Sequence, residues 1–302
     1  MAISNPPNPW ATREVEYLEG APEVKLEVFA DRTRNILAKN DSPDVGFTWS
    51  VNPYRGCFHA CAYCYARPSH EYLSLGAGTD FDRKIVIKPE APALLRAAFA
   101  KKSWRGETVV FSGVTDCYQP LEASYRLTRG CLEVCVERAN PAAIITKSPL
   151  IERDIDVLAE LARVASAHVT VSVPFWDAER AAGATSAGYV LLRLPGSVKA
   201  VFEQRLRASL PLTAERVLHR IRETRGGQLY DSRFGVRGRG EGTYALAIRT
   251  LFQTTAARLG FRAHGHEDGH AMGDSDVRVQ VRTPAAGLPR RGSQLALFDR
   301  ES

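Results

Sequence analysis

The stretch Asn52-Pro53-Tyr54-Arg55-Gly56-Cys57-Phe58-His59-Ala60-Cys61-Ala62-Tyr63-Cys64 carries three cysteines with three and then two residues between them. It comes directly after a predicted strand over residues 47–51, and loops at the carboxyl ends of strands are where parallel α/β folds build their sites. Three thiolates can bind three irons of a [4Fe–4S] cube, which leaves the fourth iron open to an outside molecule. Zinc is the alternative, with Cys117 or His59 as a further ligand, but structural zinc prefers four protein ligands. We therefore expect Cys57, Cys61 and Cys64 to hold a [4Fe–4S] cluster.

Short β-branched segments alternate with amphipathic segments on both sides of this stretch, which predicts an α/β fold with a parallel sheet. The expected strands cover residues 47–51, 84–88, 108–112, 142–146, 168–173 and 187–194. The expected helices cover residues 91–102, 122–138, 151–165, 198–208, 213–223 and 244–259.

Four regions follow from this pattern. Residues 1–46 are polar and rich in proline, and we expect an N-terminal extension with one ordered stretch near residues 23–29. Residues 47–210 form the α/β core, and residues 211–262 form a helical, arginine-rich region. Residues 263–302 are rich in Gly, His and Pro, and we expect a disordered tail.

The composition favours a cytoplasmic protein. The 302 residues are 44% hydrophobic, but no run of 18 apolar residues occurs, and the N-terminus has no apolar segment of the secretory type. Six cysteines are too few for a disulfide scaffold in a chain of this length, so we expect them to be reduced.

The net charge of +6 lies entirely in the last third of the chain. Residues 201–302 contain 17 arginines, no lysine and 11 acidic residues, whereas residues 1–200 carry 23 charges of each sign. Such an excess suits phosphate contacts, because the guanidinium group binds phosphate oxygens in pairs. The alternative is a solvated charged face without a partner.

The cysteine spacing, with Tyr63 before the last cysteine, resembles the signature of radical S-adenosylmethionine (SAM) proteins. In detail, the sequence between about Gly46 and Phe261 resembles the bacterial branch related to spore photoproduct lyase, a DNA-repair enzyme. The similar stretches are Asn-Pro-Tyr-Arg-Gly-Cys (52–57), Phe-Ser-Gly-Val-Thr-Asp (111–116), Thr-Lys-Ser (146–148) and Gly-Tyr-Val-Leu-Leu-Arg-Leu-Pro (188–195).

This resemblance implies a partial TIM-type (β/α)6 barrel, a [4Fe–4S] cluster whose open iron chelates SAM, and reductive cleavage of SAM to a 5′-deoxyadenosyl radical that abstracts hydrogen. It also implies an electron donor such as flavodoxin or ferredoxin, and it makes nucleic acid the expected partner.

Polar residues at the predicted strand ends are candidates for binding the cofactor. They are Tyr63, Ser112, Gly113, Thr115, Asp116, Lys147, Ser148 and Ser172, with Arg193 as a further candidate. Asp116 can accept from the SAM ammonium or form an Asx turn, and Lys147 can meet a carboxylate or phosphate or lie at the rim.

Three cysteines lie outside the triad. Cys117 is a candidate hydrogen donor by the resemblance, or a free loop cysteine without a role. Cys131 and Cys135 are spaced one helical turn apart, and we expect them to be buried as small apolar residues.

The tail contains two further motifs. His264, His266 and His270 lie with Glu267 and Asp268 and are either solvated or metal-binding. Gln294, Leu295, Leu297 and Phe298 resemble the peptide that docks bacterial DNA-processing proteins on the sliding clamp, although such residues can also fold back on the core.

Between Pro174 and Ala187, the chain departs from the family that it resembles. Twelve residues there barely suffice for one short crossover, so the core is expected to be shortened near residues 175–186 and to lack the fifth barrel strand and its flanking helices. We expect a narrower five-stranded sheet or a strained barrel, with weakened binding of SAM.

There are two alternatives to a radical SAM enzyme that acts on nucleic acid, and the missing strand favours the first of them. One is an iron–sulfur or zinc protein, catalytically weakened or inactive, that binds DNA or the clamp. The other is a radical SAM enzyme with a substrate other than nucleic acid.

Overall fold

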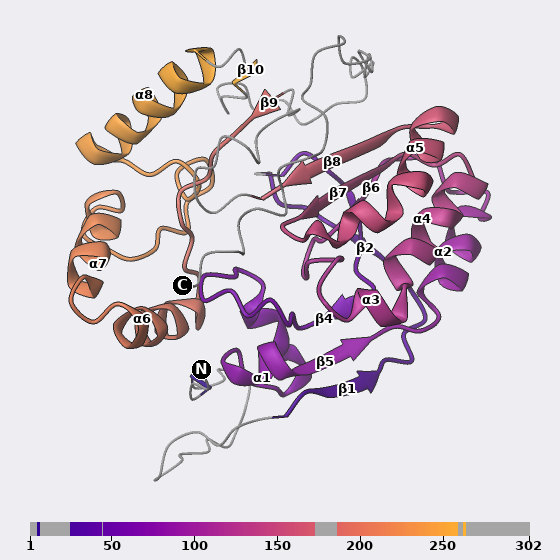
Figure 1. Cartoon of the computed structure of the whole chain (residues 1–302), viewed down its shortest axis with the longest axis horizontal. Coiled ribbons are helices and arrows are strands. Elements are labelled where there is room, and N and C mark those ends of the chain that lie inside the picture. Colours follow the sequence, from indigo (N-terminus) through magenta and orange to yellow (C-terminus); the bar gives the residue numbers. More distant parts are fainter. Residues whose placement is uncertain (1–4, 7–24, 44, 173–185, 259–261, 264–302) are drawn as a thin grey trace, which may run out of the picture. The chain divides into compact units, whose positions relative to one another are not determined.

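A five-stranded sheet forms the centre of the computed structural model, which describes residues 5–6, 25–43, 45–172, 186–258 and 262–263. Its strands lie in the order β2 (Leu37–Lys39), β3 (Trp49–Val51), β6 (Val109–Phe111), β7 (Ala142–Thr146) and β8 (Ala167–Val171), and Figure 1 shows β7 and β8 side by side. The pairs from β3 to β8 are parallel, whereas β2 runs antiparallel to β3. The mixed α/β class expected from the sequence is therefore confirmed.

A second, three-stranded sheet holds the predicted strand over residues 84–88. It consists of β1 (Glu27–Ala30), β5 (Lys84–Ile87) and β4 (Tyr54–Arg55), with β5 in the middle. The strand was predicted at the right place, but it does not belong to the central sheet. The ordered stretch predicted near residues 23–29 overlaps β1, which begins at Glu27.

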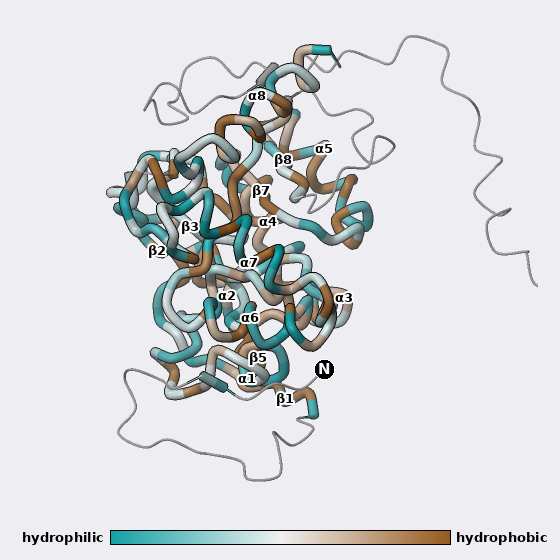
Figure 2. Tube along the Cα trace, turned by 90° about the vertical axis from the view of Figure 1, so that its left-hand side faces the viewer, coloured by the Kyte–Doolittle hydropathy of each residue, from teal (hydrophilic) through white to brown (hydrophobic). Residues whose placement is uncertain are grey.

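Helices alternate with the strands as the sequence predicts. The 3₁₀ helices are η1 (Arg67–Leu73) and η2 (Pro149–Asp154). The α-helices are α1 (Thr79–Arg83), α2 (Ala91–Phe99), α3 (Glu122–Tyr125), α4 (Leu127–Glu137), α5 (Ile155–Val164), α6 (Val198–Ser209), α7 (Ala214–Glu223) and α8 (Gly242–Arg258). Apolar and polar residues alternate along these helices (Figure 2), as expected for helices with one face against a core. No helix in the described part of the chain is long and apolar enough to cross a membrane.

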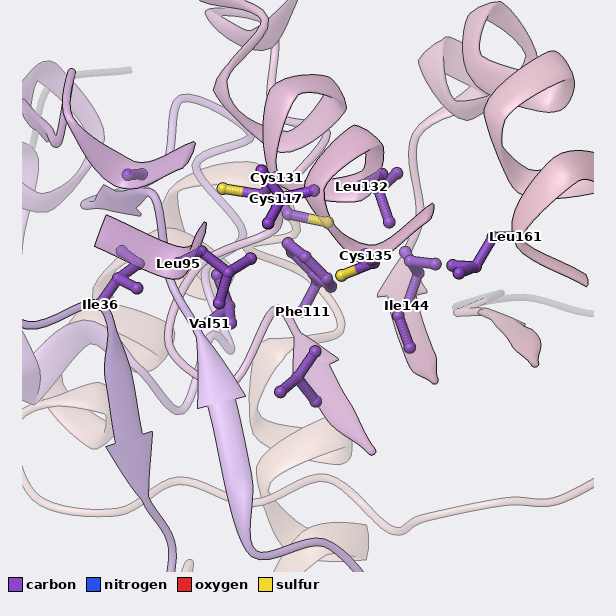
Figure 3. Close-up of a cluster of buried hydrophobic side chains, with 14 of the residues drawn as sticks. Ile36, Val51, Leu95, Phe111, Cys117, Cys131, Leu132, Cys135, Ile144 and Leu161 are labelled. Atoms are coloured by element: carbon purple, nitrogen blue, oxygen red, sulfur yellow. The ribbon is translucent and has the colours of Figure 1, made fainter. Parts of the chain in front are cut away.

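The main core lies between the central sheet and helices α2, α4 and α5, which contact one another in that order (Figure 1). Val51, Phe111 and Ile144 are paired in register across β3, β6 and β7 and are fully buried. Cys131 and Cys135 of α4 are fully buried in the same core (Figure 3). Their prediction as small core residues is confirmed.

The single helix predicted over residues 122–138 is divided at Arg126, which has a positive φ of 52°. The cause is the buried carboxylate of Glu122, which accepts from the backbone N–H groups of Thr128 and Arg129 at 3.0 and 3.1 Å. Glu122 thereby satisfies two N–H groups in the first turn of α4 that lack partners within the helix. The chain must turn at Arg126 to bring them to it.

The strand predicted over residues 187–194 is wrong for most of its length. Only β9 (Ser186–Ala187) is a strand, and it pairs with β10 (Arg262–Ala263). Beyond it, Leu191 N–H donates to Gly238 O at 2.8 Å, and the Arg225 guanidinium donates to Leu192 O at 2.9 Å. A loop and a side chain, rather than a neighbouring strand, therefore satisfy this backbone.

The outer edge of β8 is uncovered among the described residues. Within them β8 pairs only with β7, and the side chains of Val169 and Val171 are exposed. Four of the expected strands lie in the central sheet, as β3, β6, β7 and β8, and its remaining described strand is β2, from the predicted N-terminal extension. The proposed shortening near residues 175–186 falls almost wholly on 173–185, outside the described residues, so the missing barrel segment stays a prediction.

Replacing Phe111 with alanine tests the core. Phe111 is fully buried between β3 and β7, so we expect the substitution to lower the free energy of unfolding by about 3–5 kcal/mol. Denaturant unfolding followed by circular dichroism measures this loss. The control is Leu246→Ala on the exposed face of α8, for which we expect a change within about 0.5 kcal/mol. Equal losses for the two variants would contradict the assigned core.

Candidate functional site

The three cysteines lie in the loop that leaves β4 and enters η1. Gly56, directly before Cys57, has a φ of 76°, and a Cβ added there would lie 2.8 Å from His70 Cε1 and 3.0 Å from the Phe81 carbonyl oxygen. Both the positive φ and the lack of space require glycine at this position. The Cys57 N–H donates to the Phe81 carbonyl at 2.9 Å, which fixes the start of the loop against α1.

The guanidinium group of Arg67 holds the middle of the loop. Its Nε and one of its terminal nitrogens donate to the Cys61 carbonyl at 3.0 and 2.8 Å. Its other terminal nitrogen donates to the carbonyls of Ala77 and Gly78 at 2.8 and 3.0 Å. Arg67 is fully buried and also pairs with Asp82 at 2.8 Å. One side chain thus connects the cysteine loop to the segment before α1.

Helix α6 reaches the same loop through Arg205. Its guanidinium group donates to the Ala60 carbonyl and pairs with the second carboxylate oxygen of Asp82. Asp82 is buried, and it therefore accepts from Arg67 and Arg205 on its two oxygens. The helix predicted over residues 198–208, at the end of the predicted core, therefore directly supports the cysteine loop.

Gln119 clamps the backbone on both sides of Cys57. Its amide nitrogen donates to the Gly56 carbonyl at 3.3 Å, and its amide oxygen accepts from the Phe58 N–H at 3.0 Å. Gln119 is fully buried. An isolated glutamine in a loop gives no signal in the sequence, because its partners lie about 60 residues away.

Lys147 extends from the end of β7 to the middle cysteine. Its Nζ donates to Cys61 Sγ at 3.2 Å and lies 5.3 Å from the centre of the Tyr63 ring. Burial lowers the pKa of Lys147, but the sulfur of Cys61 together with Tyr63 and Cys64 raises it by more, so the net shift is upward and the ammonium form is favoured. The structure therefore places Lys147 against the cysteine loop, beside Tyr63, and the binding of the cofactor by these two residues stays a prediction.

Asp116 connects the loop after β6 to the end of β7. Its carboxylate accepts from Thr146 Oγ1 at 2.7 Å, from the Lys147 N–H at 3.0 Å and from the Tyr118 N–H at 3.0 Å. The last of these bonds is an Asx turn, which was one of the two alternatives for this residue. His59 Nε2 lies 3.6 Å from the carboxylate, so Asp116 also faces the cysteine loop.

Ser112 and Gly113 form the turn that follows β6. Ser112 has a φ of 81°, in the left-handed region that serine rarely adopts, and its Oγ accepts from the Cys117 N–H at 2.9 Å. The Gly113 carbonyl accepts from Tyr65 Oη at 2.8 Å. This turn therefore joins the loop after β6 to the residue that follows the last cysteine.

Two polar atoms in this region are buried without a hydrogen-bond partner. They are Thr115 Oγ1 and His59 Nε2. Burial lowers the pKa of His59 against the opposing effect of Asp116. Buried polar groups are normally hydrogen-bonded, so two atoms near Asp116 that make no hydrogen bond fit a site for a polar molecule.

The other predicted site residues have different surroundings. Ser148 caps η2 by accepting from the Leu150 N–H at 3.3 Å, and Ser172 is exposed after β8. The Arg193 guanidinium lies 6.0 Å from the Tyr65 ring centre. The Cys117 side chain is buried in the main core (Figure 3), and burial raises its pKa far above the ordinary value. Thus Ser148 has a structural partner, and Cys117 lies on the core side of its loop.

The tail motifs predicted from the sequence lie outside the described residues. They comprise His264, His266, His270, Glu267 and Asp268, and the clamp-like Gln294, Leu295, Leu297 and Phe298.

The cysteine triad is a donor set that suits a [4Fe–4S] cluster, because each of its three thiolates can bind a different iron. Among the described residues, no group of three His, Cys, Asp or Glu side chains is arranged to hold a single metal ion. Burial raises the pKa of Cys57 and of Cys64, so both thiols are protonated at neutral pH until a metal displaces their protons.

Comparison with known proteins gives one family match. The model of the radical SAM superfamily matches residues 51–221, which is more than half of the chain.

The similar relatives are uncharacterized proteins. One from Mycobacterium tuberculosis (strain ATCC 25618 / H37Rv) is 44% identical over 133 residues, which cover 44% of this chain and 39% of the relative. One from Methanocaldococcus jannaschii is 30% identical over 140 residues, which cover 46% of this chain and 50% of the relative. The chain thus spans half or less of the length of these relatives.

The similar solved structures are of spore photoproduct lyase. One, complexed with dinucleoside spore photoproduct, is 12% identical with a TM-score of 0.48 and covers 79% of this chain and 81% of that chain. Another, a mutant with bound AdoMet and dinucleoside spore photoproduct, is 13% identical with a TM-score of 0.49 and covers 83% and 87% of the two chains.

Replacing Arg205 with methionine tests the support that α6 gives to the loop. We expect Arg205→Met to reduce iron uptake during anaerobic reconstitution, because the Ala60 carbonyl and Asp82 lose a buried donor. The control is Arg207→Met on the same helix, whose partners Glu203 and Glu215 lie at the surface. Iron assay and absorbance near 400 nm measure the uptake. Equal iron content in the two variants would contradict a supporting role for Arg205.

Proposed function

The chain belongs to the radical SAM superfamily, whose members use a [4Fe–4S] cluster and SAM, and we propose that it is a radical SAM enzyme acting on nucleic acid. The observation that carries the proposal is the triad of Cys57, Cys61 and Cys64 in a loop fixed by Arg67 and Gln119. In this proposal the three thiolates hold the cluster, and the residues at the ends of β6 and β7 bind SAM.

When bound, the reduced cluster supplies the electron that cleaves SAM to methionine and a 5′-deoxyadenosyl radical, which then abstracts a hydrogen atom from the substrate. The protein's part is to hold and orient these groups and to exclude water. Arg67 keeps the Cys61 carbonyl turned into its own guanidinium. Gln119 holds the backbone around Cys57 in the same way, so the sulfur atoms are positioned before the cluster binds.

In this proposal, the polar groups beside the triad hydrogen-bond SAM. Thr115 Oγ1 and His59 Nε2 are buried without partners, and each can hydrogen-bond a polar ligand. Asp116 is fixed by Thr146 and by the backbone of Lys147, and its remaining acceptor capacity suits the ammonium group of SAM. Ser112 and Gly113 shape the turn that presents these residues.

The arginine excess supports nucleic acid as the substrate class. Arg216 and Arg220 are exposed on α7, and Arg220 lies over the Tyr244 ring of α8 at 4.9 Å. They line an open cavity of about 400 Å³ whose apolar walls include Val217 and Ile221. Exposed guanidinium groups next to an aromatic ring suit phosphates and bases together. The resemblance to the spore photoproduct lyase branch adds DNA repair as the finer form of this proposal, with a flavodoxin or ferredoxin as electron donor and the sliding clamp as a partner of the tail.

A second function is favoured by the outer edge of β8. Val169 and Val171 are exposed there, and no further strand is paired with β8 in the described residues. The shortened core that the sequence predicts near residues 175–186 would leave SAM without contacts on that side. The alternative is therefore an iron–sulfur protein that binds nucleic acid without turnover.

Anaerobic reconstitution tests the chemistry. The protein is loaded with iron and sulfide, reduced with dithionite in the presence of SAM, and assayed for 5′-deoxyadenosine by mass spectrometry. We expect about four irons per chain and steady release of 5′-deoxyadenosine. The variant Cys61→Ala should lose both, whereas Cys135→Ala, a core cysteine remote from the loop in sequence, should retain both.

The outcomes separate the two functions. Iron uptake without release of 5′-deoxyadenosine would support the binding protein. Undiminished iron and product in Cys61→Ala would overturn the assignment of the triad.

Salt dependence tests the substrate class. Fluorescence anisotropy with a labelled DNA duplex should show an affinity that falls about tenfold or more between 50 and 200 mM salt, because phosphate contacts release counterions. We expect the double variant Arg216→Ala, Arg220→Ala to bind more weakly and with a shallower slope. The control is Arg163→Ala on α5, an exposed arginine outside this region. Weak binding that does not respond to salt would instead favour a substrate other than nucleic acid.

A further inference from the structure

The contact between Lys147 and Cys61 joins a cation to a cysteine that is proposed to bind the cluster. The Nζ–Sγ distance of 3.2 Å lies within hydrogen-bonding range for sulfur. Both residues are partly buried, so solvent screens the charge less than at the surface. An ammonium group at this distance is a donor and a positive charge at once.

The position of Lys147 is fixed from two sides. Its backbone N–H donates to Asp116 at 3.0 Å, and Asp116 is in turn held by Thr146 at 2.7 Å. The side chain then passes the Tyr63 ring, whose face attracts the ammonium group at 5.3 Å. Because the Lys147 side chain is held at its backbone and near its ammonium group, it loses little further conformational entropy when it binds the sulfur.

We propose that Lys147 raises the reduction potential of the [4Fe–4S] cluster by hydrogen bonding to the Cys61 thiolate. This inference rests on the proposed function, because it requires the triad to hold the cluster. Hydrogen bonds to ligand sulfurs and the local charge are among the factors that set the potential of such clusters. Reduction adds one electron from an external donor, so the added negative charge is stabilised by the ammonium group. Lys147 then acts through Cys61 and makes the cluster easier to reduce.

A redox titration without SAM tests the proposal. The wild type, Lys147→Met and Lys147→Gln are reconstituted, titrated anaerobically with dithionite and mediators, and followed by absorbance and by electron paramagnetic resonance of the reduced cluster. At a fixed potential we expect the ratio of reduced to oxidised cluster to fall about tenfold in Lys147→Met, which corresponds to about 59 mV for a one-electron couple. Lys147→Gln retains a donor without the charge, and it should show a smaller fall. Lys102→Met, in the exposed loop after α2, is the charge-matched control and should titrate as the wild type.

Each outcome decides the proposal. Equal potentials for the wild type and Lys147→Met would overturn it. The titration is then repeated with SAM: if the potential of Lys147→Met falls below that of the wild type only in this second titration, Lys147 acts on SAM and the proposal is also overturned. If Lys147→Met takes up no iron, the comparison of wild type with Lys147→Gln decides: a lower potential supports the proposal and an equal one overturns it. Failure of the wild type itself to take up iron would instead refute the proposed function.

Discussion

The buried guanidinium group of Arg67 is the group on which the cysteine loop depends. It satisfies three backbone carbonyls and pairs with Asp82, and it has no contact with solvent. Removing one partner of such a buried pair typically costs about 3–5 kcal/mol, because the other charge is left uncompensated. The loop holds three thiols within eight residues, and a short loop of this kind needs its backbone fixed from outside. Arg67 fixes this backbone from the first position of η1, which directly follows the loop.

Asp82 extends this support to the C-terminal helices. Because its two oxygens accept from Arg67 and Arg205, a displacement of α6 also changes the surroundings of the loop. Tyr63 packs against the apolar cluster that includes Leu194 and Phe202, so the link is apolar as well as ionic. Helix α6 lies inside the core that the sequence predicts to end at residue 210, so this link joins the cysteine loop to the last helix of that core.

Local patterns in the sequence predicted the elements well, and they failed where a distant side chain decided the backbone. The triad was predicted because cysteine spacing is a local signal. The elements β6, β7 and α5 were predicted because the periodicity of their apolar residues is also a local signal. The strand over residues 187–194 was wrong because Arg225 and Gly238 satisfy backbone groups that an alternating apolar pattern assigns to a sheet. Arg67 and Gln119 were missed because nothing near them in the sequence distinguishes them from surface residues. Their importance comes from carbonyls and N–H groups that only the fold brings within reach.

The two sets of contacts on the loop act on different properties of the same cysteines. Arg67 and Arg205 bind backbone carbonyls, so they determine where the thiolates lie and hence whether a cluster is retained. Lys147 binds a sulfur, so it acts on the electrons that the sulfur donates to iron. Retention depends on the sum of many contacts, whereas the potential depends on charge within a few ångströms of the ligand. A substitution at Lys147 that preserves the loop should therefore change the reduction potential of the cluster without changing how much cluster the protein retains. The two effects are separate because Lys147 binds a sulfur, whereas Arg67 and Arg205 bind backbone carbonyls.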